Sequence, residues 1–414
     1  MPPIPVEEAV ARITSGLKRL PTEAIPLLDA LGRVLAQDVE ADRALPAHPT
    51  SSMDGFAVRA ADAAHGPSNL KLVGDVPAGI MPSLVLGPGE TARIMTGAIV
   101  PSGADAVVPV EDTEAHWDAG EATALGSDII IHRSARIGDF IRPVGDDLKP
   151  GQQVLAAGTT LRPPDIGLLA VLGHATVPVV RQPRVAILST GDELTEPGQP
   201  LAPGHIYDSN AYALATVVRS WGAIPVRVPP ARDTLDSVRA AFHAALAHSP
   251  DLILSSAGVS VGAYDVVRTV IDEFGAVDFW RVNVRPGKPL AFGHIAGVPM
   301  IGLPGNPVSA LVTAELFVRP ALAALGGWTD LVETVRAAAS EALHSDGRRT
   351  YVRVILRRSE EGWTAITTGT QSSSAILSLV LADGLLIIPD GVTEVAPGML
   401  CTVRLLRPLP AAAE

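Results

Sequence analysis

Cysteine is almost absent from this chain, because Cys401 is the only one among 414 residues. A disulfide, a CxxC redox motif and a thiolate metal cluster each need at least two cysteines. The sequence therefore excludes an intramolecular disulfide scaffold, dithiol redox chemistry and a thiolate metal site. Such low cysteine usage is typical of a reducing compartment, so we expect a cytoplasmic protein.

Positive charge is also scarce. The chain has 32 Lys and Arg against 44 Asp and Glu, which gives a formal net charge of −12. Proteins that bind nucleic acid usually present a net basic face, so we expect no nucleic-acid partner. Lysine is the rarer cation: only Lys18, Lys71, Lys149 and Lys288 occur, and Lys288 stands in a loop rich in Gly and Pro.

Targeting and membrane signals are missing as well. The N-terminal stretch MPPIPVEEAV has neither a basic region nor an apolar run, so we expect no signal peptide. No apolar run reaches the roughly 18–20 residues of a membrane span, so we expect no membrane association.

What is present indicates a globular, multidomain protein. Hydrophobic residues make up 47% of the chain, charged residues 18%, and 38 Gly with 36 Pro indicate many turns. The length predicts two to four domains. Helical spacing of apolar residues predicts helices near residues 5–17, 27–36 and 163–173, whereas residues 45–147 contain short β-type runs.

The second half of the chain changes pattern twice. Buried-strand runs alternate with amphipathic helices over residues 184–327, which predicts a mostly parallel sheet covered on both faces. β-type runs then resume and predict a small barrel-like domain. We therefore predict four domains, comprising residues 1–44 with 148–180, residues 45–147, residues 181–327 and residues 328–414.

Ligands of an open parallel sheet bind at the carboxyl ends of its strands, and four polar or Gly-rich loops follow the predicted strands. The first, STGDEL at residues 189–194, offers Asp192 and Glu193 as oxygen ligands for Mg²⁺. A helix N-cap with acidic first-turn residues is an equally good interpretation of this loop. The second, SSAGVSVG at residues 255–262, could cradle a phosphate, although an ordinary Gly-rich turn is the more probable interpretation locally.

The third loop, RPGKP at residues 285–289, places Arg285 and Lys288 together and suits a tetrahedral oxyanion. Two solvated surface cations are the alternative. The fourth, GLPGNPVSA at residues 302–310, has Asn306 as a candidate helix cap, Pro307 at the first helical position and Ser309 in the first turn. Together the four loops favour an anionic, phosphate-bearing ligand with a divalent metal.

Seven motifs identify a family resemblance when taken in order and spacing: SSMDGFAVR, IMTGA, STGDEL, YDSN, GVSVG, RPGKP and GLPGNPVSA. Together with the segment QSSSAILSLVLADGLL, they make nearly the whole chain resemble the MoeA family, which includes the gephyrin E domain. The resemblance implies an α/β multidomain fold. Its parts are a central MogA-like, mostly parallel α/β sandwich domain, an elongated N-terminal domain, an inserted β domain and a C-terminal β-barrel-like domain.

The resemblance also assigns roles to residues. The implied catalytic positions are Asp54, Thr96, Glu193, Asp233 and Asp265, of which the last three also suit Mg²⁺; capping of the following helix is the plainer interpretation of Asp233. The implied molybdate-binding positions are Arg285, Lys288, Ser309, Arg353 and Ser373. The expected substrate-binding positions are Arg142, Asp147, Gly191, Asp192, Ser255, Gly258, Ser260, Gly262, Pro304, Gly305, Asn306 and Pro307.

This sequence departs from the family pattern at a few positions. Arg281 and Arg285 stand where members often carry lysine, and Ala257 replaces a usual glycine. Arginine keeps the positive charge but presents it as a planar fork.

The activity implied by the resemblance is insertion of molybdate into adenylylated molybdopterin, with release of AMP and formation of molybdenum cofactor. It implies Mg²⁺ as cofactor, molybdate as substrate and a homodimer whose cleft lies between the α/β domain of one subunit and the inserted domain of the other. Expected partners are a molybdopterin adenylyltransferase and recipient molybdoenzymes. Two alternatives stay open: a molybdopterin adenylyltransferase and a non-catalytic scaffold like gephyrin.

Overall fold

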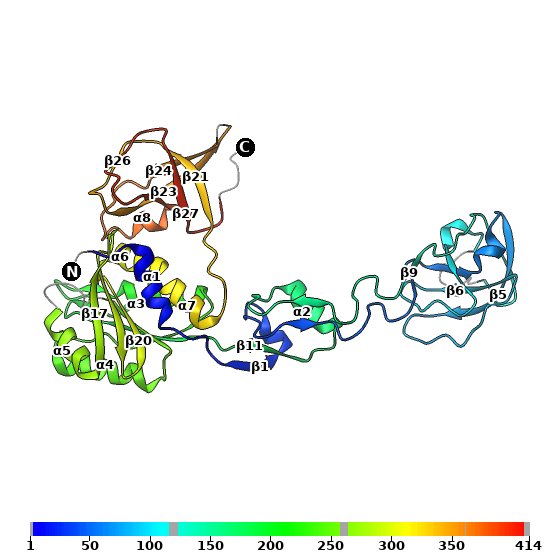
Figure 1. Ribbon diagram of the computed structural model, residues 1–414, viewed down its shortest axis with the longest axis horizontal. Coiled ribbons are helices and arrows are strands. Elements are labelled where there is room, and N and C mark those ends of the chain that lie inside the picture. Colours follow the sequence, from blue (N-terminus) through cyan, green and yellow to red (C-terminus); the bar gives the residue numbers. More distant parts are fainter. Residues whose placement is uncertain (1–2, 116–122, 257–263, 361, 410–414) are drawn as a thin grey trace. The chain divides into compact units, whose positions relative to one another are not determined.

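The computed structural model describes residues 3–115, 123–256, 264–360 and 362–409 (Figure 1). Of Tyr264, Asp265, Arg268, Asp278, Phe279 and Trp280 it describes the backbone alone. The chain forms two compact units. The large unit comprises Met1–Gln37, Ala157–Ile166 and Ala175–Glu414, and the small unit comprises Asp38–Ala156 and Gly167–His174. The finer borders of the four predicted domains stay predictions.

The small unit consists mainly of strands, as its short β-type runs predict. Its five-stranded sheet has the order β7-β4-β6-β5-β8, in which the β5–β6 pair is parallel and the other pairs are antiparallel. Phe56, Leu72 and Ile131 are wholly buried in its core. The elements are β2 (Val39–Glu40), β3 (Thr50–Ser51), β4 (Gly55–Val58), η2 (Ala60–Ala63), β5 (Ser68–Val76), β6 (Glu90–Ile94), β7 (Ala106–Pro109), η3 (Val110–Asp112), β8 (Asp128–Ile131), β9 (Ile141–Arg142) and β10 (Gln153–Leu155).

The N-terminal part of the large unit begins with the predicted helix, α1 (Val6–Ser15), whose buried Val6, Ala9 and Ile13 recur at helical spacing. β1 (Thr22–Pro26) then pairs antiparallel with β11 (Thr176–Val180). The predicted helix near residues 163–173 is confirmed as α2 (Pro163–Val171).

The predicted helix over residues 27–36 is wrong beyond its first turn. Only η1 (Leu27–Ala30), a 3-10 turn, forms there. Gly32 follows with a φ of 73°, in the left-handed region where helices commonly end. The backbone N–H of Leu35 then donates to the carbonyl oxygen of Thr159 at 2.9 Å, so this stretch pairs with extended chain instead.

The α/β domain has a six-stranded sheet of order β15-β12-β16-β20-β19-β17. The first four strands are parallel, as predicted, whereas β19 runs antiparallel to both β20 and β17. The sequence prediction did not include this antiparallel edge. The strands are β12 (Arg184–Ser189), β15 (Ile224–Arg227), β16 (Leu252–Ser256), β17 (Gly275–Arg281), β19 (Pro289–Ile295) and β20 (Val298–Leu303), beside a small parallel pair, β13 (Leu194–Thr195) and β14 (Ile206–Tyr207).

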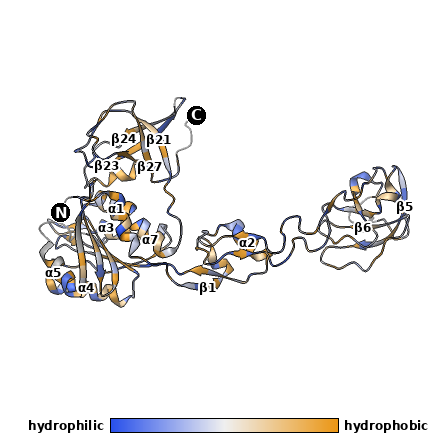
Figure 2. Ribbon diagram, in the orientation of Figure 1, coloured by the Kyte–Doolittle hydropathy of each residue, from blue (hydrophilic) through white to orange (hydrophobic). Residues whose placement is uncertain are grey.

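Both faces of this sheet are covered. Along β12, Val185 and Ile187 join one buried cluster, while Ala186 and Leu188 join another. The first cluster includes residues of α1, α3 (Ser209–Ser220) and the helix after β20, and the second includes α4 (Leu235–Ala247) and α5 (Tyr264–Phe274). Hydrophilic and hydrophobic residues alternate along α4 and α5 in Figure 2, as amphipathic helices on a sheet require.

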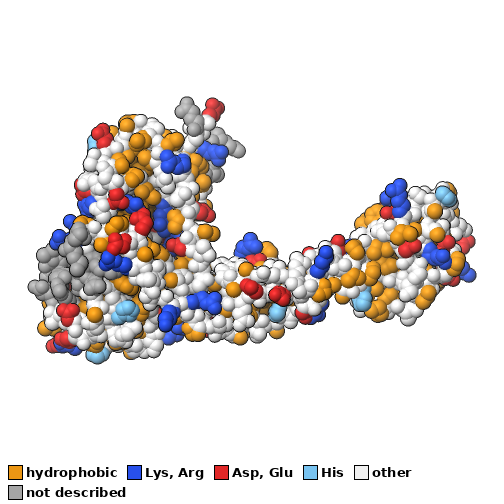
Figure 3. Space-filling view, in the orientation of Figure 1, with side chains coloured by type: hydrophobic (Ala, Val, Ile, Leu, Met, Phe, Trp, Pro, Cys, Tyr) orange, Lys and Arg blue, Asp and Glu red, His pale blue; other side chains and the backbone are white. Residues whose placement is uncertain are grey.

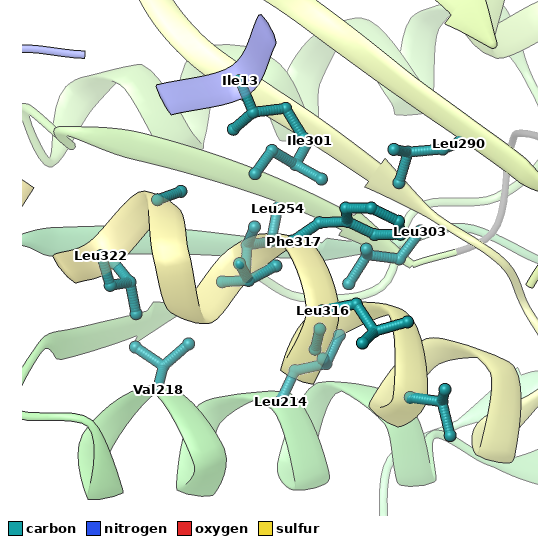
Figure 4. Close-up of a cluster of buried hydrophobic side chains, with 14 of the residues drawn as sticks. Ile13, Leu214, Val218, Leu254, Leu290, Ile301, Leu303, Leu316, Phe317 and Leu322 are labelled. Atoms are coloured by element: carbon teal, nitrogen blue, oxygen red, sulfur yellow. The ribbon is translucent and has the colours of Figure 1, made fainter. Parts of the chain in front are cut away.

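One core helix is longer than the predicted limit on apolar runs, which was set below the length of a membrane span. The helical stretch Pro307–Gly326 is long and apolar enough, by length and composition, to cross a membrane, but 78% of its most apolar window is buried. Figure 4 shows Phe317 and Leu322 of this stretch packed among side chains from α1, α3 and β20. It is therefore a core helix of the α/β domain, made of α6 (Pro307–Thr313), the π-helical η4 (Ala314–Val318) and α7 (Arg319–Gly326).

The predicted C-terminal barrel is confirmed. Five strands follow the order β23-β24-β21-β27-β25, and pairing of β23 with β25 closes the ring. β18 (Val284–Arg285), from the α/β part of the chain, adds to β23. The other elements are β21 (Thr334–Ala339), β22 (Leu343–His344), β23 (Arg349–Ser359), β24 (Gly362–Thr367), α8 (Leu377–Val380), β25 (Gly384–Ile388), β26 (Glu394–Val395) and β27 (Leu400–Leu405).

Polar contacts hold the barrel against the α/β domain. Arg404 of β27 donates from Nη2 to Oε1 of Glu315, a residue of the core helix that is 9% exposed, at 2.7 Å. Arg349 of β23 pairs with Glu7 of α1. Figure 3 shows side chains of both charges gathered where these two parts meet. The junction between the barrel and the α/β domain is therefore fixed by buried and half-buried ion pairs as well as by β18. A cleft opens beside this junction.

Candidate functional site

A cleft of about 1230 Å³ lies in the large unit. Its walls come from the end of β16 at Ser256, from the segments that follow β12 and β20, from the loop after β18 and from the barrel. It brings together three of the four loops that the sequence predicts at strand ends. The predicted site residues that line it are Gly191, Glu193, Asp233, Arg285, Lys288, Pro304, Gly305, Asn306, Pro307, Ser309, Arg353 and Ser373.

Other predicted residues lie elsewhere. Asp192 is exposed beside the cleft, and Ser255 is buried in β16 next to Ser256, which does line it. Gly258, Ser260 and Gly262 lie outside the described residues, as does the side chain of Asp265. Asp54, Thr96, Arg142 and Asp147 belong to the small unit.

Within the small unit, Asp54 and Thr96 lie together although they are far apart in sequence. Oδ1 of Asp54 accepts hydrogen bonds from the backbone N–H of Thr96 at 2.7 Å and from its hydroxyl at 2.9 Å. Arg142 pairs with Asp146 and not with Asp147, whose side chain is exposed. The structure thus joins Asp54 to Thr96 by hydrogen bonds, whereas Arg142 does not pair with Asp147.

Two cations stand at the end of β18 and in the loop after it. The side chains of Arg285 and Lys288 are exposed and make no hydrogen bond or ion pair with a described residue. Gly287 between them has a φ of 105°, and a Cβ added there would come within 2.3 Å of Cγ2 of Thr313 in α6. Glycine therefore lets the loop pack against the helix, and the packed loop holds both cations at the cleft.

Arg353 supplies a third cation, from inside the barrel. It is only 2% exposed and makes no ion pair with a described carboxylate. Its Nε donates to the hydroxyl of Ser378 at 3.1 Å, and its Nη2 donates to the carbonyl oxygen of Ser372 at 3.0 Å. Burial, together with the positive charge of Arg285, lowers the pKa of Arg353 to about 10. A buried cation without a counter-ion favours an anion in this part of the cleft.

Hydroxyl groups complete the cationic part. Ser309 of α6 is 4% exposed and lines the cleft together with Ser373. Asn306 directly precedes α6, but the prediction that its side chain caps the helix is wrong, because that side chain makes no cap hydrogen bond. Its Nδ2 donates instead to Oγ of Ser373 at 3.1 Å. The backbone N–H of Val308 donates to the carbonyl oxygen of Ser373 at 3.0 Å. These bonds join the barrel loop to the start of α6.

Acidic side chains lie in the segments that follow β12 and β15. Glu193 and Asp233 line the cleft, and Oδ1 of Asp192 accepts the backbone N–H of Asp233 at 3.1 Å. Burial, followed by the charges of Asp192 and Glu193, raises the pKa of Asp233. Among the described side chains, no group of three His, Cys, Asp or Glu could hold a metal ion by itself.

The helix-cap interpretations of these acidic residues are wrong. STGDEL leads into β13 and not into a helix, so Asp192 and Glu193 are not first-turn residues. The cap of α4 is Thr234, whose hydroxyl accepts the backbone N–H of Ser237, and not Asp233. Neither Glu193 nor Asp233 therefore caps a helix, and both residues line the cleft.

We expect Asp233→Asn to raise the melting temperature at pH 7. Because the pKa of Asp233 is raised, the folded state binds its proton more tightly than the unfolded chain does. The contribution of this group to stability therefore falls as pH rises from 3.8 through the raised pKa. Thermal melts should show a gap in favour of the variant at pH 7 that closes toward pH 3.8. A less stable variant at pH 7 would contradict this account.

Sequence reasoning missed several residues of the cleft. Asn210 in α3 ties two loops together, because its Nδ2 donates to Oγ of Ser256 at 2.8 Å and to the carbonyl oxygen of Gly305 at 2.7 Å. Asp208 caps the same helix. The signal was the YDSN motif, an acidic residue before a predicted helix, which on its own indicates only a cap.

Comparisons with known proteins agree with this architecture. Residues 4–173 match the family model described as the MoeA N-terminal region, domains I and II. Residues 186–324 match a probable molybdopterin binding domain, and residues 336–406 match the MoeA C-terminal region, domain IV.

Relatives cover nearly the whole chain. Molybdopterin molybdenumtransferase 2 of Mycobacterium tuberculosis is 42% identical over 392 residues, which are 90% of this chain and 92% of that protein. Molybdopterin molybdenumtransferase of Bacillus subtilis is 37% identical over 416 residues, with 98% of this chain and 94% of that protein covered.

A crystal structure of the molybdopterin biosynthesis MoeA protein from Pyrococcus horikoshii shares the fold at a TM-score of 0.83 and 33% identity. The match covers 98% of this chain and 99% of that one. The predicted alternative of a free-standing adenylyltransferase does not account for the matched regions on both sides of the α/β domain. The chain belongs to the MoeA family, the molybdopterin molybdenumtransferases of molybdenum cofactor biosynthesis.

Proposed function

We propose that this chain inserts molybdate into adenylylated molybdopterin, releasing AMP and forming molybdenum cofactor. The observation that carries the proposal is a set of three cations that pair with no described carboxylate, Arg285, Lys288 and Arg353, which open onto one cleft. Hydroxyls of Ser309 and Ser373 lie on the same cleft. Charge-assisted hydrogen bonds from such a set suit a tetrahedral dianion, and molybdate is one.

The adenylylated pterin would occupy the rest of the cleft. Its pyrophosphate is assigned to the loop of Ser255, Gly258, Ser260 and Gly262 and to the start of α6, near Pro304, Gly305 and Pro307. Backbone N–H groups of a Gly-rich loop suit phosphate oxygens. This arrangement keeps the two anions at separate positions, one on side-chain cations and the other on backbone amides.

Glu193 and Asp233 fit Mg²⁺. Oδ1 of Asp233 is buried and has no hydrogen-bond partner among the described residues, and burial, followed by the neighbouring negative charges, raises the pKa of the same carboxyl. A divalent cation would relieve that repulsion, and Mg²⁺ is usually held by one or two protein carboxylates together with substrate phosphates. Asp265 is the proposed third acidic residue. When bound, Mg²⁺ would neutralise the charge of the pyrophosphate.

The residues of the cleft would act mainly by positioning and by neutralising charge. No serine or threonine that lines the described part of the cleft is hydrogen-bonded to a histidine base. We therefore assign no covalent intermediate. Arg285, Lys288 and Arg353 would hold molybdate beside the ligand, and fixed cations stabilise charge that develops when the pyrophosphate is cleaved.

The assembly is part of the proposal. We infer a homodimer in which Asp54 and Thr96 of one subunit, together with Arg142 and Asp147, complete the cleft of the other subunit. A molybdopterin adenylyltransferase that supplies the substrate, and the molybdoenzymes that receive the product, are the proposed partners. The free, buried Cys401 is compatible with a cytoplasmic location.

Product analysis separates this activity from its alternatives. The purified protein, given adenylylated molybdopterin and molybdate, should form AMP and a cofactor that activates an apo-molybdoenzyme. Given molybdopterin and ATP, it should form no adenylylated product. The reverse pattern would identify an adenylyltransferase, and no turnover with either pair would indicate a scaffold.

A further inference from the structure

Three oxygen atoms on the cleft have no partner among the described residues and no role in the proposed chemistry. Oγ of Ser189, Oγ1 of Thr190 and Oδ2 of Asp208 are buried and make no hydrogen bond within the described part of the chain. The three residues are 2%, 4% and 2% exposed, and all three line the cleft. None belongs to the cationic group that suits molybdate.

The fold brings these residues to one place. Ser189 ends β12 and lies opposite Ser256 of β16 in register, and the backbone N–H of Thr190 donates to the carbonyl oxygen of Ser256 at 3.4 Å. Asn210, which donates to Oγ of Ser256, lies two residues after Asp208. The three side chains therefore surround the carboxyl ends of two neighbouring parallel strands, where ligands of such sheets bind.

Helix capping does not explain Asp208. Its Oδ1 accepts the backbone N–H of Ala211 at 3.0 Å and so caps α3. An asparagine would cap a helix about as well and would bury no charge. Because a buried oxygen without a hydrogen bond destabilises a folded protein, the second carboxylate oxygen and the two hydroxyls require another explanation.

The chemistry of the cluster selects its ligand. The carboxylate only accepts hydrogen bonds and repels phosphate and molybdate, and each of the two hydroxyls can accept a hydrogen bond as well as donate one. We propose that Ser189, Thr190 and Asp208 form a subsite that accepts hydrogen bonds from uncharged N–H or O–H donors of the adenylylated pterin. This inference rests on the proposed function. The shared donor chemistry has two sources in that ligand, the amino-pyrimidinone edge of the pterin and the nucleoside part of the adenylate.

Asp208→Asn is the sharpest test, because it keeps the oxygen that caps α3 and exchanges only the free acceptor for a donor. We expect the affinity for adenylylated molybdopterin, measured by calorimetry without molybdate, to fall about ten- to a hundredfold. The matched control is Asp236→Asn, which removes the same charge from an exposed position in the first turn of α4. It should bind like the unchanged protein.

Two further titrations identify the donor. If the affinity for AMP falls to the same extent in Asp208→Asn, the donors are those of the nucleoside; if it is unchanged while the affinity for the full ligand falls, they are those of the pterin. Unchanged affinity for adenylylated molybdopterin would overturn the proposal. It would also be overturned if saturating Mg²⁺ restored full affinity, because Asp208 would then be a metal ligand.

Thr190→Val provides a second variant with a readout that a structural role would not produce. It replaces the unpartnered hydroxyl with a methyl group of similar size. We expect a melting temperature equal to or higher than that of the unchanged protein, together with a several-fold loss of affinity for adenylylated molybdopterin. Lower stability with unchanged affinity would mean that the hydroxyl is structural. Because binding is measured without turnover, the subsite can stand or fall separately from molybdate insertion.

Discussion

Lys288→Ala should raise the molybdate concentration for half-maximal AMP release about ten- to a hundredfold. A charge-assisted hydrogen bond of about 1.5–3 kcal/mol corresponds to such a change. Because the side chain of Lys288 is exposed and makes no hydrogen bond with a described residue, thermal stability should hardly change. Affinity for adenylylated molybdopterin should fall much less, since its phosphates are assigned to a separate loop.

Titration of molybdate at saturating pterin substrate measures this effect. Lys18→Ala is the matched control, since Lys18 is also exposed and lies in the same unit but does not line the cleft. Lys288→Arg should recover part of the affinity by keeping the charge. An unchanged molybdate requirement together with a collapse of pterin affinity would mean that the two anion positions have been exchanged.

A mixture of two inactive variants should recover activity if the cleft is shared between subunits. Asp54→Asn alters the small unit, and Asp233→Asn alters the large unit. Each alone should lower activity about a hundredfold or more, by analogy with the removal of one fixed charge-stabilising group. In a heterodimer, one of the two sites would combine an unchanged small unit with an unchanged large unit.

Equal mixing of the two variants should then recover about a quarter of the unchanged activity, since half of the dimers are mixed and each has one intact site. Asp54→Asn keeps the oxygen that accepts both hydrogen bonds of Thr96, so the small unit should fold. Size-exclusion chromatography with differently tagged subunits verifies exchange. Mixed dimers without recovered activity would contradict a shared cleft.

The periodicity of apolar residues predicted the strands and helices that have strong apolar patterns. It missed strands that form only because they pair with segments distant in the sequence. β12 and β16 carry runs of buried residues that a parallel sheet requires, and both were predicted. β21 was missed because its sequence, TVRAAA, ends in three alanines, which have low strand propensity. Its partners, β24 and β27, follow it in sequence and fix its conformation.

The residues of the site likewise fall into those that local sequence predicted and those that it could not. The loops that follow strands on one chain segment were predicted from local sequence, and the structure brings Glu193, Lys288 and Ser309 to one cleft. Arg353 lies within an apolar strand, TYVRVIL, and only the resemblance indicated its role. Local sequence cannot show that this arginine is buried without a counter-ion, because its surroundings come from the turn at Ser372 and from Ser378.

The most direct test of the central claim is the rate of AMP release from adenylylated molybdopterin as molybdate is titrated onto the purified protein. The account predicts a rate that saturates with molybdate and one AMP released for each molybdenum inserted. AMP release at the same rate without molybdate would contradict it, because cleavage of the pyrophosphate would then be independent of the dianion that the three cations are proposed to hold.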